Sequence, residues 1–121
     1  MLRAVQVCVE ERASNVAVLN FASAKNPGGG FLGGSLAQEE SLATASALYT
    51  SLISQETSFY CVNRRPEHKA FYTHRMISSP HVPVFRDDTG ELLAQPYTVG
   101  MLSLLHTACC GVKTPCTHSS K

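Results

Sequence analysis

The pattern of apolar and polar positions divides the first half of the chain into a strand, a loop and a helix. Residues 15–23, NVAVLNFAS, are mostly apolar and rich in strand-forming residues, which predicts a buried strand of a parallel or mixed sheet. In residues 35–54, SLAQEESLATASALYTSLIS, Leu36, Glu40 and later apolar residues recur at helical spacing, which predicts a helix. Ser35, with Gln38 three positions later, resembles a capping box and marks the expected start of that helix.

The second half of the chain changes character twice. Residues 56–75 are polar and aromatic, which predicts a loop with one short helix. Residues 76–102 read as short strands, of which the first is confined to a sheet edge or a bulge by Pro80 and Pro83. The sequence DDTG, residues 87–90, predicts a hairpin turn. Residues 106–121 show neither the helical nor the strand periodicity of apolar positions, so we expect an irregular tail there.

Composition sets the class of protein. A chain of 121 residues that is 44% hydrophobic is expected to fold as one domain with a modest core. Its net charge of +1 provides no overall field that would attract nucleic acid or a membrane. No apolar run is long enough to span a bilayer and no signal peptide is recognisable, so we expect an intracellular protein, in the cytoplasm or the nucleus. Five cysteines, with Cys8 and Cys61 in apolar surroundings, favour free thiols over a disulfide framework.

The loop between the strand and the helix, NPGGGFLGG, carries five of the eight glycines. Glycines allow positive φ and a close approach of a ligand to the backbone, and exposed N–H groups there would form a cradle for an anion. No GK[ST] follows, which excludes a P-loop, and neither the GxGxxG spacing nor the distant acidic residue of a dinucleotide site is present. The alternative is a tight structural turn without a ligand.

Glu39 and Glu40 stand in the first turn of the expected helix. Negative charge is favoured there by about 0.3–1 kcal/mol, which is a sufficient structural reason for acidic residues. Successive helical residues point about 100° apart, so only one of the two carboxylates can face a given atom squarely. Such a pair suits one carboxylate that transfers a proton beside one that holds sugar hydroxyls.

Together these residues resemble a known family. One motif is similar to the signature of poly(ADP-ribose) glycohydrolases: Gly28-Gly29-Gly30, a seven-residue spacer and Gln38-Glu39-Glu40. The surrounding sequence resembles the microbial type of that family. The resemblance covers residues 15–99. It implies a macrodomain-like α/β/α fold, with a mixed sheet flanked by helices, and hydrolysis of the ribose–ribose O-glycosidic bond of poly(ADP-ribose).

The resemblance also implies roles for individual residues. Glu40 resembles the catalytic acid/base, and Glu39 resembles the residue that holds the ribose hydroxyls at the scissile link. Asn26 is similar to an asparagine that contacts the ribose, and Gln38 to an orienting residue. The glycines Gly28, Gly29 and Gly30 resemble the loop along the diphosphate. The implied partner is poly(ADP-ribose) or ADP-ribose, bound by a monomer without a cofactor, a metal, a membrane or direct nucleic-acid contact.

The sequence departs from the family after the hairpin. Members of the family continue into further strands and a second glycine-containing loop, whereas residues 106–121 match nothing in it. We therefore expect residues 1–105 to be a partial, C-terminally truncated catalytic domain and residues 106–121 to be an irregular tail. A module that binds ADP-ribose without cleaving it, or an inactive fragment, is the alternative to an enzyme.

Other candidate sites have simpler explanations. The tail residues His106, Cys109, Cys110, Cys116 and His118 lack the paired spacing of a zinc site, so no metal is expected. The basic loop 64–69 is interpreted as a solvated loop. Asp87 and Asp88 are interpreted as turn residues, and Phe71 and Tyr72 as packing residues that could alternatively stack on adenine.

Overall fold

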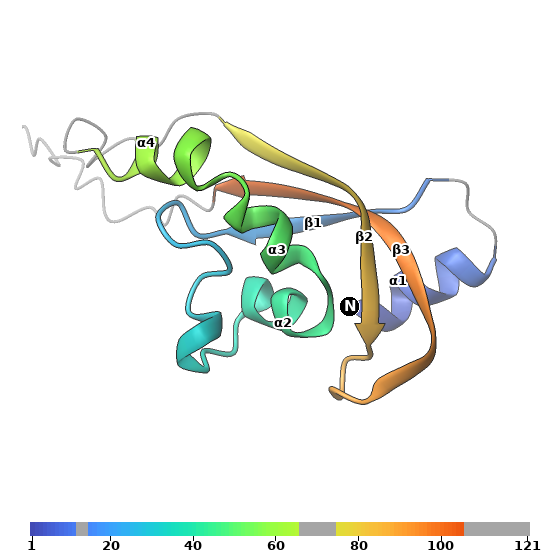
Figure 1. Cartoon of the computed structure of the whole chain (residues 1–121). Helices are drawn as coiled ribbons and strands as arrows, with labels where there is room; N and C mark the ends of the chain where they lie inside the picture. Colours follow the sequence, from blue (N-terminus) through green and yellow to red (C-terminus); the bar gives the residue numbers. More distant parts are fainter. Residues whose placement is uncertain (12–14, 66–74, 106–121) are drawn as a thin grey trace, which may run out of the picture.

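The computed structural model describes residues 1–11, 15–65 and 75–105 (Figure 1). Its elements, in chain order, are α1 (Leu2–Glu10), β1 (Ala17–Ala22), the 3-10 turn η1 (Phe31–Gly33), α2 (Gln38–Ala45), α3 (Leu48–Ile53), the π-helical turn η2 (Glu56–Tyr60), α4 (Cys61–Asn63), β2 (Met76–Arg86) and β3 (Leu92–Leu105). Within these ranges no helix is both long and apolar enough to cross a membrane.

The sheet is mixed, as the sequence predicts. Its order is β1-β3-β2, with β3 in the centre, parallel to β1 and antiparallel to β2. The parallel pairing runs from Ala17 opposite Gly100 to Ala22 opposite Leu105. The strand that leads into the glycine loop is therefore held by the last described strand of the chain.

The strand β2 is an edge strand with a bulge, as Pro80 and Pro83 predict. The register shifts between Ser79 and Val82, and His81 within the shift has a φ of 56°. An edge strand tolerates proline because an outward-facing N–H is not needed by a neighbour.

The hairpin turn is confirmed, but the expected short strands are not. In the turn, Asp87 Oδ1 accepts hydrogen bonds from the backbone N–H of Thr89 at 2.8 Å and of Glu91 at 3.0 Å. Gly90 completes the turn with a φ of 91°. On either side the chain forms one long hairpin, with 11 residues in β2 and 14 in β3. The prolines bend or shift the strands without ending them.

The strand β1 is confirmed in place, but the prediction that it is buried holds for one face only. Its residues alternate between exposed and buried, because Val18, Asn20 and Ala22 face the helices while Leu19 and Phe21 are 40% and 51% exposed. Figure 1 shows α2 and α3 on the same side of the sheet. Among the described elements, helices therefore cover one face of β1.

The core lies between that covered face and the helices. It includes buried side chains from α2, α3 and all three strands, among them Leu42, Leu48, Leu52, Val84 and Met101. Burying a side chain of this size contributes about 1.5–3 kcal/mol. These contacts fix α2, and with it the two glutamates, relative to β1.

The single helix expected over residues 35–54 begins late and is interrupted. Ser35 is not the N-cap, because α2 begins at Gln38 after Ala37 and has no side-chain cap. At Ser46 the backbone is extended and forms an isolated antiparallel bridge with Val84 of β2. The Ser46 hydroxyl donates to the Leu42 carbonyl at 2.6 Å, which satisfies a carbonyl at the end of α2. A tertiary contact with the sheet has thus replaced one turn of helix.

Residues 56–63 contain more helix than expected. The turn η2 leads directly into α4. The last two residues of η2, Phe59 and Tyr60, are buried. Of the remaining predicted loop, residues 66–74 lie outside the described residues, as do Phe71 and Tyr72.

The helix α1 was not predicted from the sequence. Its first N–H groups are capped by a distant side chain, since Asp88 accepts hydrogen bonds from Leu2 N and Arg3 N, both at 3.0 Å. Leu2 itself is buried in the core. Asp88 therefore fixes α1 to the hairpin, whereas its neighbour Asp87 forms the turn.

Candidate functional site

The glycine loop joins β1 to α2 and curls back on itself in tight turns. Gly28 and Gly29 have φ values of 69° and 59°, which side chains with a Cβ rarely adopt. The N–H of Gly29 donates to the Asn26 carbonyl at 3.0 Å, and that of Phe31 donates to the Gly28 carbonyl at 3.0 Å. The loop therefore places three consecutive glycines against the first turn of α2.

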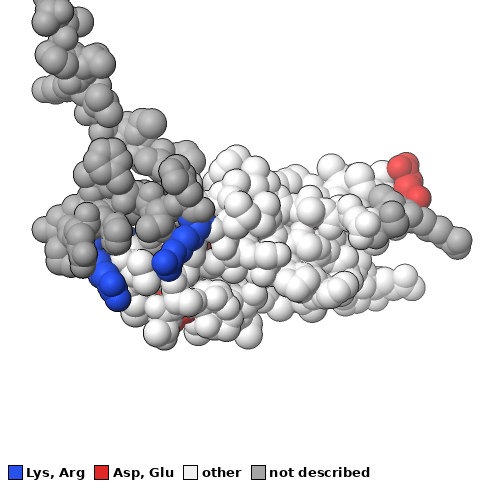
Figure 2. All heavy atoms as spheres, turned by 90° about the horizontal axis from the view of Figure 1, so that it is seen from above, with Lys and Arg blue, Asp and Glu red and all other residues white. Residues whose placement is uncertain are grey.

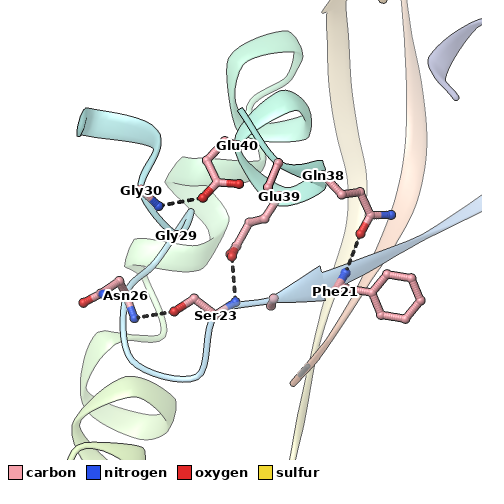
Figure 3. A pocket seen from close by; sticks show the side chains of 10 residues that line it. Phe21, Ser23, Asn26, Gly29, Gly30, Gln38, Glu39 and Glu40 are labelled. Atoms are coloured by element: carbon pink, nitrogen blue, oxygen red, sulfur yellow. Dashed lines mark hydrogen bonds between the residues drawn. The ribbon is translucent and has the colours of Figure 1, made fainter. Parts of the chain in front are cut away.

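Glu40 points into this loop, as its helical phase predicts. Its Oε1 accepts a hydrogen bond from Gly30 N at 2.8 Å, and the residue is 8% exposed. Figure 3 shows the side chain reaching from α2 toward Gly30. A Cβ on Gly29 would overlap with Glu40 Oε1, so this contact requires glycine.

Glu39 lies deeper and is held by both carboxylate oxygens. Oε2 accepts from Ser23 N at 2.6 Å and Oε1 accepts from Gly28 N at 3.1 Å, with the residue 3% exposed. Burial raises the pKa of Glu39 from 4.5 to about 7, because the hydrogen bond from Ser23 only partly offsets the loss of solvent and the charge of Glu40 raises it further. Glu39 thus gains and loses a proton near neutral pH.

Gln38 connects the helix to the strand. Its Oε1 accepts from Phe21 N at 2.9 Å, and its Nε2 donates to the Leu19 carbonyl at 2.9 Å. The side-chain amide therefore pairs with β1 in the way a neighbouring strand would. These two bonds hold the first turn of α2, which carries the two glutamates, against β1.

Asn26 stands at the start of the loop. Its backbone N–H donates to Ser23 Oγ at 3.2 Å, and its carbonyl forms the turn to Gly29. In Figure 3, Asn26 lies across the cavity from the glutamates.

These residues enclose a cavity of about 570 Å³. A cavity of this size falls in the range of about 300–1,000 Å³ that is usual for small-molecule sites. Its lining residues are Phe21, Ala22, Ser23, Asn26, Gly29, Gly30, Ala37, Gln38, Glu39 and Glu40. The cavity is thus lined by every residue predicted for the site except Gly28, which contacts the site through the hydrogen bond from its N–H to Glu39 Oε1.

The prediction of a free anion cradle is wrong in one respect. The N–H groups of Gly28, Gly29 and Gly30 all donate to acceptors within the chain, two of them to the glutamates. The loop therefore stabilises the two buried carboxylates. A bound anion would have to meet other donors or displace these bonds.

Two supports of the loop were missed from the sequence. Tyr49 packs beneath it, since a Cβ on Gly28 would stand 2.8 Å from Tyr49 Cδ2, and its ring lies 5.1 Å from that of Phe31. Arg64 donates from Nε to the Lys25 carbonyl at 2.7 Å and forms an ion pair with Glu56. Aromatic and basic residues at these positions carry no local signal, because their contacts are made by the tertiary fold.

Charged side chains gather toward the two ends of one face of the molecule. Figure 2 shows Lys and Arg side chains at one end of the face seen from above, with small acidic areas among them, and a mainly uncharged surface that extends to the acidic side chains at the other end. Within the described ranges no cluster of three or more His, Cys, Asp or Glu side chains could hold a metal. The histidines and cysteines of residues 106–121 lie outside those ranges, and so does the predicted tail. Cys8 and Cys61 are free, but they are exposed and not in apolar surroundings.

Comparison with known proteins gives matches over most of the chain. Residues 1–87 match the family model for the microbial-type PARG catalytic domain. The poly(ADP-ribose) glycohydrolase from Thermomonospora curvata bound to the inhibitor ADP-HPD is 47% identical with a TM-score of 0.81, over 86% of this chain and 38% of that chain. The enzyme from Deinococcus radiodurans in complex with ADP-ribose is 53% identical with a TM-score of 0.75, over 85% of this chain and 41% of that chain.

The chain therefore spans about two-fifths of the length of these solved structures. A search of the curated proteins found no match.

Proposed function

The chain belongs to the family of microbial-type poly(ADP-ribose) glycohydrolase catalytic domains, and on this premise we propose that it binds ADP-ribose units and hydrolyses the ribose–ribose bond of poly(ADP-ribose). The site residues proposed for this activity are Glu40 and Glu39, with Asn26, Gln38 and the three glycines placing the substrate.

The observation that carries the proposal is the different bonding of the two carboxylates. Both oxygens of Glu39 accept backbone N–H groups, whereas the described residues donate to Glu40 only at Oε1. Both side chains line the same cavity. Glu40 thus has an oxygen available to a ligand, while Glu39 is fixed in place.

This difference supports separate chemical roles. Glu40 would protonate the departing ribose oxygen as positive charge develops on the sugar, and would then take a proton from the attacking water. Glu39 would hold ribose hydroxyls through the free lone pairs of its oxygens. Because the two carboxylates come from adjacent residues of one helix, they do not form the opposed pair, about 5 Å or more apart, of ordinary glycosidases.

The glycines support the same proposal. The backbone at Gly29 and Gly30 lines the cavity without a side chain, so a ligand can approach the main chain there. Solved relatives were crystallised with ADP-ribose and with the inhibitor ADP-HPD, which supports an ADP-ribose unit as the ligand.

The test uses the full chain with two measurements. Binding of ADP-ribose is measured by calorimetry, and release of ADP-ribose from poly(ADP-ribose) is measured over time, for the wild type and for Glu40→Gln. Release by the wild type that is lost in Glu40→Gln, with binding retained, supports the proposal. Binding without release by the wild type would favour the alternative, a non-catalytic ADP-ribose-binding module, and absence of both would contradict either function.

A further inference from the structure

The cavity beside the glycine loop offers little positive charge to an anionic ligand. Glu39 and Glu40 line it, and the N–H groups of the loop glycines already donate to acceptors within the chain. Each ADP-ribose unit carries a diphosphate, which is negatively charged at neutral pH. The cations that attract such a ligand therefore come from another part of the surface.

Basic side chains gather where the start of the glycine loop meets the end of α4. Lys25 lies in the loop, Arg64 and Arg65 follow α4, and all three residues are exposed. We call these three residues the basic cluster. Figure 2 shows Lys and Arg side chains at the end of the molecule where α4 lies in Figure 1. The other described basic residues are Arg3 of α1, Arg75 just before β2, and Arg86 at the end of β2.

The backbone of Lys25 is fixed from both sides. Its N–H donates to Ser23 Oγ at 3.4 Å, and its carbonyl accepts a hydrogen bond from Arg64 Nε at 2.7 Å. Arg64 also forms an ion pair with Glu56 of η2, which offsets its charge. The basic cluster is thus held together by a bond between two segments that are 39 positions apart in the chain.

Lys25 and Arg65 provide the net positive charge of the basic cluster. Among the described residues, neither side chain has an ion-pair partner. The end of a helix favours basic residues, which gives a structural reason for Arg65 but not for Lys25 in the loop. Lysine and arginine both form strong, charge-assisted hydrogen bonds with phosphate oxygens. The two side chains therefore match a diphosphate in charge and in chemistry.

The basic cluster adjoins the cavity without forming its wall. Ser23 and Asn26, on either side of Lys25, line the cavity, whereas Lys25, Arg64 and Arg65 do not. A ligand that fits inside the cavity does not need these cations. A ligand that continues out of the cavity past Asn26 reaches them.

We propose that the basic cluster binds the diphosphate of a second ADP-ribose unit, the one next in the polymer to the unit held in the cavity. This inference rests on the proposed function, because a polymer of ADP-ribose presents a diphosphate outside the cavity and free ADP-ribose does not. The cluster gives the chain a preference for poly(ADP-ribose) over its single unit.

The first test compares the affinities of the full chain for ADP-ribose and for a purified two-unit oligomer, both measured by calorimetry. The variant is Lys25→Gln/Arg65→Gln, which removes two exposed charges and leaves Arg64 to hold the loop. We expect the oligomer to bind about three- to tenfold more weakly, because exposed ion pairs contribute modestly. The affinity for ADP-ribose is expected to stay at the wild-type level, and added salt should reduce the wild-type preference for the oligomer.

The matched control for Arg65→Gln alone is Arg3→Gln, which removes the same charge from an exposed position on α1 outside the cavity lining. Its affinity for the oligomer should equal that of the wild type. Equal weakening in the two variants would reduce the effect to overall charge and would overturn the proposal. A weakening that is as large for ADP-ribose as for the oligomer would also overturn it, because the cations would then serve the cavity.

Inorganic diphosphate separates a failure of this proposal from a failure of the proposed function. The backbone amide signals of Lys25 and Arg65 are followed by NMR as diphosphate is added to the full chain and to the double variant. Shifts at both positions in the wild type, absent in the variant, support a diphosphate site at the basic cluster. If the wild type shows these shifts but binds no ADP-ribose, the glycohydrolase proposal fails and the diphosphate site stands. Absence of the shifts in the wild type would overturn the basic cluster as a phosphate site.

Discussion

Glu39 and Glu40 are consecutive in the chain, and their carboxylates meet the glycine loop two residues apart. Gly28 N donates to Glu39 Oε1 at 3.1 Å, and Gly30 N donates to Glu40 Oε1 at 2.8 Å. Gly29 lies between these contacts, and a Cβ there would stand 3.2 Å from Glu39 Oε2 and overlap with Glu40 Oε1. The conformation of the loop and the positions of both carboxylates therefore depend on each other.

Replacement of Gly29 by alanine is expected to disrupt the site more than the fold. The new methyl group would displace the Glu40 carboxylate, and the φ of 59° would add strain. We expect ADP-ribose affinity, measured by calorimetry, to fall at least about tenfold, a loss of about 1.4 kcal/mol.

The control for Gly29 is Gly33→Ala in the same loop. A Cβ at Gly33 would meet no atom within 4 Å, so binding is expected to stay at the wild-type level. Equal affinities for the two variants would mean that the close contact of Gly29 with the glutamates has no bearing on the ligand.

The two glutamates are expected to differ in the kind of defect that their glutamine variants cause. Glu40→Gln keeps size and hydrogen-bonding capacity but cannot transfer a proton, so release of ADP-ribose should fall by about 10²–10⁴ with binding retained. Glu39→Gln should mainly weaken binding, because Glu39 is held by Ser23 and Gly28 at the cavity wall. Parallel measurements of affinity and single-turnover rate separate the two effects, and a larger rate defect in Glu39→Gln would reverse the assignment.

The stability of the chain is expected to fall as pH rises from about 4.5 to about 7. The pKa of Glu39 is about 7 in the folded state against 4.5 ordinarily, so between these values the folded state retains a proton that the unfolded state has lost. Each pKa unit corresponds to about 1.4 kcal/mol, so the effect is on the order of 3 kcal/mol.

Urea unfolding at a series of pH values measures this effect. Glu39→Gln should remove most of the decrease in the free energy of unfolding between pH 4.5 and pH 7, whereas Glu11→Gln, at an exposed position after α1, should leave it in place. A slope that persists in Glu39→Gln would assign the pH dependence to another group.

Removal of the Asp88 carboxylate is expected to loosen α1. Asp88 accepts hydrogen bonds from Leu2 N and Arg3 N, the role of an N-cap side chain. Loss of such a cap typically costs about 1 kcal/mol, so Asp88→Ala should lower the free energy of unfolding by about that amount, while Glu91→Ala on the same hairpin should not.

The contribution of Asp88 should also depend on pH. Although burial raises the pKa of Asp88, hydrogen bonds from Arg3 and the chain terminus lower it overall. Its stabilisation is therefore present above the ordinary pKa of aspartate and is lost as pH falls. A difference between wild type and Asp88→Ala that grows in acid would contradict the capping role.

The elements that could be predicted from the sequence are those set by local pattern. The strand before the glycines, the prolines of β2 and the DDTG turn are each determined by neighbouring residues, and the spacing from Gly28 to Glu40 already indicated that loop and helix meet. The break at Ser46 has no local cause, because it exists for the bridge to Val84 in a strand nearly forty positions later. The cap of α1 by Asp88 is likewise a long-range contact.

The same distinction between local pattern and long-range contacts applies to the site. Glu40 facing the loop follows from helical phase, but the internal use of the loop N–H groups does not, since it depends on how far α2 lies from β1. Asn20 looked like an ordinary member of a strand in the sequence. Its partner Ser103 comes from β3, which only the tertiary fold brings beside β1.

The parallel pairing of β1 with β3 determines when the site can form. Asn20 and Ser103 are 83 positions apart, and β1 has no described strand neighbour other than β3. Closing so long a loop is entropically costly, so contacts of this kind form late in folding and slow it. During synthesis on the ribosome, β1 and the glycine loop would emerge early and wait unpaired until β3 followed. The local hairpin of β2 and β3 is then the expected nucleus, and assembly of the two glutamates against the loop its final step.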